Sequence, residues 1–160
     1  MDRTLLLVDD EVSLIHALKR ELHGEGYRLL TAASGEEALG IMAAGEVQVI
    51  LSDYRMPGMN GVELLTQTRQ LYPETVRMVL SGFSDLEAIV DAINLGHIYK
   101  FINKPWEREQ LCAVVGDAFA QYELICRGAQ FSRIFESTRE GIFILGADAA
   151  IRSSNPAFSR

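Results

Sequence analysis

Short apolar runs alternate five times with segments of helical periodicity, and this alternation limits the chain to few folds. The apolar runs cover residues 4–8, 27–32, 47–53, 76–80 and 98–102, and they are typical of buried strands. The helical patterns cover residues 13–23, 35–44, 61–71 and 85–94, and a fifth begins after Pro105. Strict alternation with short loops predicts an α/β domain, in which helices cover both faces of a parallel sheet.

Cap residues mark the start of two of these helices. Ser34 and Ser84 each precede a helical pattern, and Glu37 and Glu87 follow them three residues later. This spacing is typical of a capping box, in which the serine hydroxyl accepts a hydrogen bond from a backbone amide of the first turn. The sequence therefore predicts serine caps at both helices.

Three carboxylates follow predicted strands. Asp9 and Asp10 come directly after the first strand, and Asp53 ends the third. Because open α/β sheets hold their chemistry at the carboxyl ends of the strands, we expect these acids to meet in one crevice. Like charges at short distance oppose their common ionisation, so such a site needs a divalent cation or a lysine. Lys104, after the fifth strand, is placed to supply that charge.

Composition narrows the class of protein. The hydrophobic content of 48% over 160 residues suits one domain with a proper core and an appendage. A net charge of −7 without a basic stripe argues against nucleic acid or an anionic membrane as a partner of this segment. The N-terminus leads straight into a strand, so we expect no signal peptide and a cytoplasmic location.

Cys112 and Cys126 lack the spacing typical of metal ligands and are expected to be buried free thiols.

The motifs at the strand ends resemble the receiver domain of a two-component response regulator. The resemblance covers residues 4–122 and implies a flavodoxin-like fold, a five-stranded parallel sheet of order 2-1-3-4-5 with a helical extension at its C-terminus. The motifs that carry it are Val8-Asp9-Asp10-Glu11, the run from Ser52 to Gly61, Ser81-Gly82, and Phe101-Ile102-Asn103-Lys104-Pro105-Trp106.

The resemblance implies a phosphoacceptor and a metal site. Asp53 would accept a phosphoryl group from a sensor histidine kinase or a phosphotransfer protein, and the phosphorylated domain would switch a downstream output domain. Asp10, Asp53 and the backbone carbonyl of Arg55 would bind Mg²⁺ directly, and Asp9 partly through water. A receiver is no enzyme in the ordinary sense, because it catalyses only its own phosphorylation and dephosphorylation. The residue types fit this role, since phosphoryl transfer depends on positioning the reacting groups and on neutralising the charge of the transferred group.

Three further residues complete the implied switch. Lys104 would pair with Asp53 at rest and with the phosphate afterwards. Ser81 would offer its hydroxyl to a phosphate oxygen, and its movement would open a space into which Phe101 turns. The Lys104–Pro105 peptide bond, by the same resemblance, would be cis.

Other classes of protein share parts of this pattern. A Mg²⁺-dependent phosphohydrolase with an aspartyl intermediate would also use Asp10, Asp53 and Lys104, but its nucleophile normally follows the first strand in an Asp-x-Asp pattern, which Asp9-Asp10-Glu11 lacks. A flavodoxin would need a hydroxyl and glycine loop at that position, where the acids would repel a phosphate. A constitutive interaction module with a receiver fold is the third alternative, and a Mg²⁺ titration would separate it.

Beyond residue 122 the pattern departs from a receiver. Apolar residues at 111, 115, 118, 122, 125 and 129 alternate in steps of four and three, which predicts that helix five continues as a linker or signalling helix over residues 123–137. Residues 138–160, with Asn155-Pro156-Ala157-Phe158, resemble the beginning of a PAS domain, too short to enclose a core. Parallel pairing of two such helices would bury the apolar stripe, so we expect a homodimer.

Overall fold

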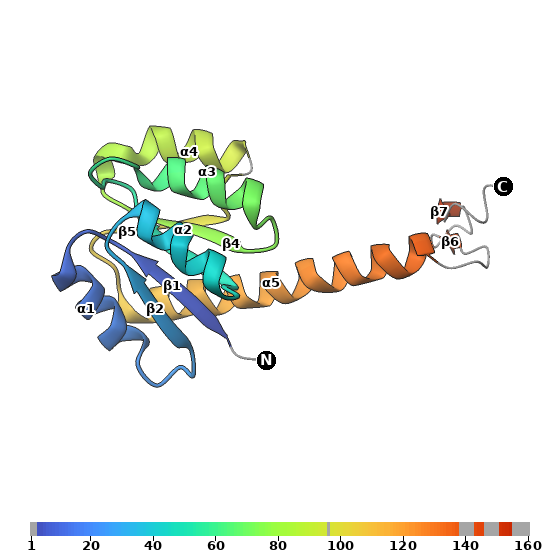
Figure 1. The fold of residues 1–160 in the computed structure, drawn as a ribbon, viewed down its shortest axis with the longest axis horizontal. Helices are drawn as coiled ribbons and strands as arrows, with labels where there is room; N and C mark the ends of the chain where they lie inside the picture. The colour runs from blue at the N-terminus through green and yellow to red at the C-terminus, as the bar shows by residue number, and fades with distance from the viewer. Residues whose placement is uncertain (1–2, 96, 138–142, 146–150, 155–160) are drawn as a thin grey trace. The chain divides into compact units, whose positions relative to one another are not determined.

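The computed structural model of the protein describes residues 3–95, 97–137, 143–145 and 151–154. The chain divides into two compact units, residues 1–122 and residues 123–160. The first unit alternates strands and helices as the sequence predicts (Figure 1). Its elements are β1 (Thr4–Val8), α1 (Val12–Leu22), β2 (Arg28–Ala32), α2 (Gly35–Ala44), β3 (Val49–Asp53), α3 (Gly61–Leu71), β4 (Val76–Ser81), the 3-10 turn η1 (Phe83–Asp85), α4 (Leu86–Asn94), β5 (Lys100–Asn103) and the start of α5 (Arg108–Ser137).

The strands form one parallel sheet in the order β2-β1-β3-β4-β5. This order confirms the flavodoxin-like fold. The register also determines which residues meet at the carboxyl edge of the sheet. Val8 pairs with Ser52, so Asp9 and Asp53 follow neighbouring positions on adjacent strands. On the other side of β3, Asp53 pairs with Leu80 of β4, whose next residue is Ser81.

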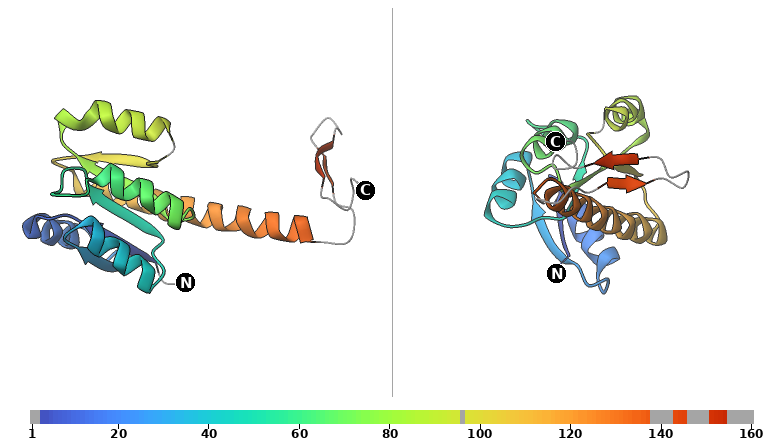
Figure 2. Two further views of the ribbon diagram at one scale, coloured as in Figure 1. Left: turned by 45° about the horizontal axis from the view of Figure 1, so that its top comes forward. Right: turned by 90° about the vertical axis from the view of Figure 1, so that its right-hand side faces the viewer.

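Helices cover both faces of this sheet. In Figures 1 and 2, α1 and α5 lie on one face, and α2, α3 and α4 lie on the other. Successive side chains of a strand point to opposite faces, so each buried strand contributes to two cores. Leu6, Val8, Ile50 and Val79 pack in the core that also contains Ala38, Met42, Leu64, Leu65 and Ile89 of α2, α3 and α4. The near-continuous apolar strands are what a sheet buried on both sides requires.

One of the two predicted serine caps is confirmed. The Ser34 hydroxyl accepts a hydrogen bond of 3.2 Å from the amide of Glu37 at the start of α2. The Glu37 carboxylate in turn accepts from the amide of Ala33, 3.0 Å away.

The cap predicted for α4 is wrong. Ser84 lies inside η1, and α4 begins at Leu86, one residue later than predicted. Asp85 takes the N-cap position and makes no side-chain cap hydrogen bond. The cause is a competing donor, because the Ser84 hydroxyl accepts a hydrogen bond from the guanidinium of Arg55 instead.

Helix α5 confirms the predicted helical extension, since it runs without interruption from Arg108 to Ser137. Leu111, Val115, Ala118 and Tyr122 are buried in the first unit, whereas Ile125 and Ala129 in the second unit are half-buried. The exposed fraction of Leu124 is 59%. In the described part of the chain, no helix is both long and apolar enough to cross a membrane.

Among the described residues, the second unit also contains two short strands. β6 (Phe143–Leu145) and β7 (Ile151–Ser154) pair antiparallel. The Asn155-Pro156-Ala157-Phe158 motif lies outside the described residues. Cys112 and Cys126 form no disulfide, as predicted, but both are half-buried rather than buried.

Candidate functional site

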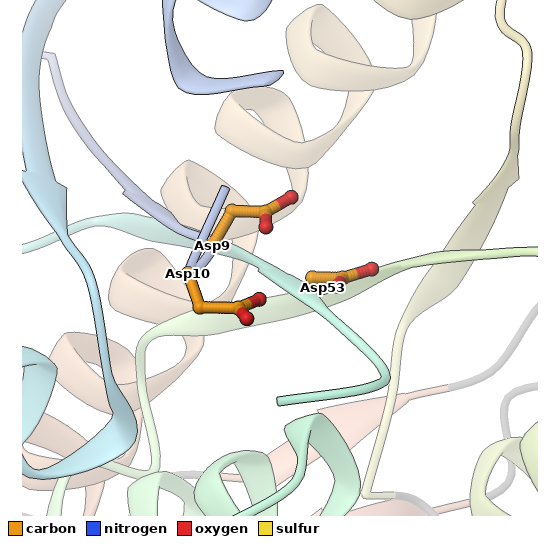
Figure 3. Close-up of side chains that lie close together, drawn as sticks. All are labelled: Asp9, Asp10 and Asp53. Carbon is orange, nitrogen blue, oxygen red and sulfur yellow. The ribbon is translucent and has the colours of Figure 1, made fainter. Parts of the chain in front are cut away.

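The three predicted acids lie together at the carboxyl edge of the sheet (Figure 3). One carboxylate oxygen from each of Asp9, Asp10 and Asp53 falls within 4.8 Å of the others. Asp9 and Asp53 are buried, with exposed fractions of 2% and 7%, and Asp10 is exposed. The three carboxylates therefore converge as the sequence predicts. They share one site, which is open to solvent on the side of Asp10.

The crowding of these carboxylates affects the pKa of Asp9. Burial, above all, raises the pKa of its carboxyl from 3.8 to about 6, and the charges of Asp53 and Asp10 add to the rise. A hydrogen bond of 2.9 Å from the amide of Glu11 to Oδ1 acts in the opposite direction, as does Lys104. Oδ2 is buried and has no hydrogen-bond partner among the described residues. An acceptor of that kind calls for a cation or a water in the site.

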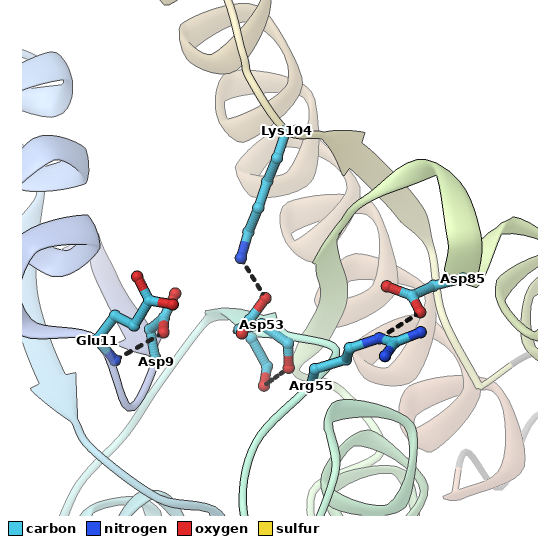
Figure 4. Close-up of polar contacts among 7 residues, drawn as sticks. Asp9, Glu11, Asp53, Arg55, Asp85 and Lys104 are labelled. Carbon is cyan, nitrogen blue, oxygen red and sulfur yellow. Dashed lines mark hydrogen bonds and ion pairs between the residues drawn. The ribbon is translucent and has the colours of Figure 1, made fainter.

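Lys104 meets the phosphoacceptor candidate directly. Its Nζ lies 2.6 Å from Oδ1 of Asp53, and the two side chains are 27% and 9% exposed (Figure 4). Burial raises the pKa of Asp53, and the hydrogen bond and charge of Lys104 offset part of that rise. The peptide bond from Lys104 to Pro105 is cis, as the resemblance implied.

Ser81 and Phe101 stand on neighbouring strands beside this pair. Ser81 ends β4 with an exposed fraction of 1%, and its hydroxyl has no hydrogen-bond partner in the part of the chain that the structure describes. Phe101, on β5 opposite Val79, is half-buried against the core. A buried hydroxyl without a partner is costly, so the Ser81 hydroxyl is able to donate a hydrogen bond within the site.

Backbone contacts hold the loop that follows Asp53. The Tyr54 amide donates to the Leu80 carbonyl at 3.0 Å, and the Gly61 amide donates to the Tyr54 carbonyl at 2.9 Å. Gly61 lies so close to the loop that a Cβ atom there would collide with the backbone oxygen of Asp53. The loop therefore needs glycine at this position to bring α3 against the end of β3.

Arg55 has a side-chain partner that sequence reasoning missed. Its Nε donates to Oδ1 of Asp85 at 2.8 Å, across thirty residues of sequence (Figure 4). The sequence predicts a role only for its backbone carbonyl, as a metal ligand, and that role stays a prediction. No local spacing indicates the Asp85 contact, because it depends on β3 and β4 lying side by side.

Comparison with known proteins identifies the family. Residues 5–116 match the family described as the response regulator receiver domain. The chain belongs to this receiver domain family. The receiver interpretation of the sequence is confirmed, and the phosphohydrolase and flavodoxin alternatives are set aside. Receiver domains of response regulators are signalling modules rather than ordinary enzymes.

Several relatives extend well beyond this receiver domain. The hydrogenase transcriptional regulatory protein HoxA of Cupriavidus necator is 44% identical over 115 residues, which are 72% of this chain and 24% of HoxA. The chain thus spans about a quarter of the length of that relative.

Solved structures that are about one-third identical in sequence share the fold of this chain. One described as adenylate cyclase from Rhodopirellula baltica has a TM-score of 0.79 and 34% identity, and the match covers 83% of this chain and 98% of that one. The receiver domain of NtrX from Brucella abortus has a TM-score of 0.69 and 30% identity, covering 72% and 98% of the two chains.

Proposed function

We propose that this receiver domain accepts a phosphoryl group on Asp53 from a sensor histidine kinase or a phosphotransfer protein, and that the modification switches an output domain. The observation that carries the proposal is the ion pair of 2.6 Å between Lys104 and Asp53, inside a cluster of three carboxylates. A buried carboxylate held by one mobile ammonium is available to attack phosphorus, and the ammonium stays nearby to meet the added charge.

The transfer step uses the chain's own residues as follows. A carboxylate oxygen of Asp53 attacks the phosphorus atom, the bond to the donor's leaving group breaks, and an acyl phosphate forms. Lys104 then exchanges the Asp53 oxygen for a phosphate oxygen, while the buried hydroxyl of Ser81 donates to another. These contacts neutralise and orient the new group, which is most of what a protein contributes to phosphoryl transfer.

The acid cluster fits a Mg²⁺ ion. Asp9, Asp10 and Asp53 bring three carboxylates together, and within the described residues the partnerless Oδ2 of Asp9 offers a ready ligand or water acceptor. The carboxylates of Asp10 and Asp53 and the backbone carbonyl of Arg55 would hold Mg²⁺ directly, and Asp9 would hold it partly through water. When bound, the ion neutralises charge on the oxygens of the group in transfer.

Ser81 and Phe101 form the proposed switch. Movement of the Ser81 hydroxyl toward the phosphate would change the packing at the end of β4, and half-buried Phe101 on the neighbouring strand β5 would follow it. The two residues would then report phosphorylation to the surface formed by β5 and α4.

We assign residues 1–122 to the receiver, residues 123–137 to a signalling helix that continues α5, and residues 138–160 to the start of a PAS domain. A parallel dimer through α5 would bury its apolar stripe and place two output segments side by side. Because its proposed phosphodonor acts inside the cell, we place this receiver in the cytoplasm.

The experiment is intact mass spectrometry after incubation with acetyl phosphate and Mg²⁺. The wild-type chain should gain one labile phosphoryl group, and chelation of Mg²⁺ should abolish the gain. Asp53→Asn should gain none. A wild-type chain that stays unmodified under these conditions, or an Asp53→Asn variant that is modified equally, contradicts the proposed function.

A further inference from the structure

Arg55 connects the phosphoacceptor loop to the start of α4. Its guanidinium donates from Nε to Oδ1 of Asp85 at 2.8 Å and from an Nη to the Ser84 hydroxyl at 3.2 Å. Figure 4 shows the side chain leading from the loop after Asp53 toward η1. One side chain thus bonds two successive residues of the turn that leads into α4.

The two ends of this contact differ in burial. The Asp85 side chain is 5% exposed and the Arg55 side chain is 69% exposed. A buried carboxylate depends on its partner, because loss of the partner leaves an uncompensated charge. The exposed guanidinium is held less firmly and can leave when a stronger anion is offered.

A phosphoryl group on Asp53 would be such an anion. It carries more negative charge than a carboxylate and presents three acceptor oxygens, a geometry that guanidinium matches well. Arg55 is only two residues from Asp53, so its side chain starts next to the modified group.

We propose that the Arg55–Asp85 ion pair is a latch that ties the start of α4 to the phosphoacceptor loop, and that the phosphoryl group on Asp53 opens it by attracting Arg55. The second half of the proposal rests on the proposed phosphorylation of Asp53. The latch gives the switch a second route to α4, separate from Ser81 and Phe101. The latch has two states because Arg55 has two alternative acceptors, and phosphorylation supplies the second and stronger one.

Hydrogen exchange of the amides in residues 84–94 tests the latch. Without phosphorylation, Arg55→Gln and Asp85→Asn should each speed exchange there by about fivefold, the scale of one partly exposed ion pair. The double variant should exchange no faster than the faster single variant, because both substitutions break the same contact. Asp117→Asn is the matched control, since it breaks the exposed ion pair with Lys100 on another face and should leave this exchange unchanged.

The same samples are then treated with acetyl phosphate and Mg²⁺, with intact mass as the record of modification. Exchange in residues 84–94 should rise in the phosphorylated wild type, and it should rise less in Arg55→Gln, whose latch is already open and where only the Ser81–Phe101 route responds. Unchanged exchange in both unphosphorylated single variants overturns the latch, as does additivity in the double variant. An equal response to phosphorylation in wild type and Arg55→Gln overturns the opening step. If the wild type gains no phosphoryl group, the proposed function fails, whereas the unphosphorylated samples still decide the latch.

Because Asp85 is buried, Asp85→Asn could perturb folding for other reasons. Arg55→Gln changes an exposed side chain and keeps the test decisive by itself. Arg55→Lys adds a graded variant, because lysine keeps the charge but cannot bond Asp85 and Ser84 with one planar fork. Its exchange should fall between those of the wild type and Arg55→Gln.

Discussion

The backbone amide of Lys104 donates a hydrogen bond of 2.8 Å to the carbonyl of Ser81. This contact extends the pairing of β4 with β5 by one residue beyond the sheet, where Ser81 already stands opposite Asn103. One backbone hydrogen bond thus connects the two residues, Lys104 and Ser81, whose ammonium and hydroxyl groups are proposed to bind the phosphate. We expect them to respond to phosphorylation as a unit.

Removing the Ser81 hydroxyl should separate modification from switching. Ser81→Ala should still accept phosphate at Asp53, because the acids and Lys104 remain. Phe101 should no longer move, because nothing draws the end of β4 toward the phosphate. Aromatic NMR shifts of Phe101, with and without acetyl phosphate, measure this coupling.

Ser34→Ala is the matched control for loss of a serine hydroxyl. It removes the cap of α2, so it should lower the free energy of unfolding by about 1 kcal/mol and leave the Phe101 response intact. A normal Phe101 response in Ser81→Ala would refute the proposed coupling.

The raised pKa of Asp9 predicts how stability depends on pH. Its folded value of about 6 lies above the ordinary 3.8, so between these values the folded protein holds a proton that the unfolded chain has released. The free energy of unfolding of the metal-free protein should therefore fall by roughly 2 to 3 kcal/mol as pH rises from about 4 to about 7. Urea melts in the presence of a chelator measure this slope.

Asp9→Asn should flatten that slope and stabilise the metal-free protein at neutral pH. Asp10→Asn, at an exposed position of the same cluster, should change the slope much less. Asp53→Asn should stabilise less than relief of repulsion alone suggests, because Lys104 loses its partner. An Asp9→Asn variant with the wild-type slope would show that another group causes the pH dependence.

Gly61→Ala should destabilise the protein, because the added methyl group meets the backbone oxygen of Asp53. The cost should be about 2 kcal/mol, as for other overpacked sites. Gly40→Ala is the control inside α2, where a Cβ meets nothing within 4 Å, and it should be neutral or stabilising by about 0.5 kcal/mol. Thermal melts compare the two variants. Equal effects of both substitutions would contradict the close contact.

Dimerisation through α5 should depend on its apolar stripe. Ile125→Glu places a charge on the predicted seam and should make the protein monomeric by light scattering. Leu124→Glu adds the same charge at an exposed position off the seam and should leave the dimer intact.

A chain truncated after Ser137 separates this cause from contacts of the following strands. If the truncated chain is still a dimer and Ile125→Glu makes it a monomer, α5 is responsible. If it is a monomer, the contact belongs to β6, β7 or residues near them, and the α5 seam is wrong.

Local patterns predicted most of the fold, because apolar runs and cap residues act within a few positions of one another. The bounds of β1, α2 and α3 agree with the sequence patterns, and Ser34 caps its helix as predicted. Convergence of Asp9, Asp10 and Asp53 followed from the sheet rule alone. The Ser84 cap failed because a distant side chain, Arg55, competes for its hydroxyl. Such contacts exist only after the strands have been placed side by side.

The most direct test of the account locates the phosphoryl group on the chain. Borohydride reduces an acyl phosphate of aspartate to homoserine, and peptide mass spectrometry then identifies the reduced residue. After treatment with acetyl phosphate and Mg²⁺, homoserine should be found at position 53 and should be absent without acetyl phosphate. Homoserine at position 9 or 10, or no reduced residue in a chain that has gained a phosphoryl group, would contradict Asp53 as the acceptor.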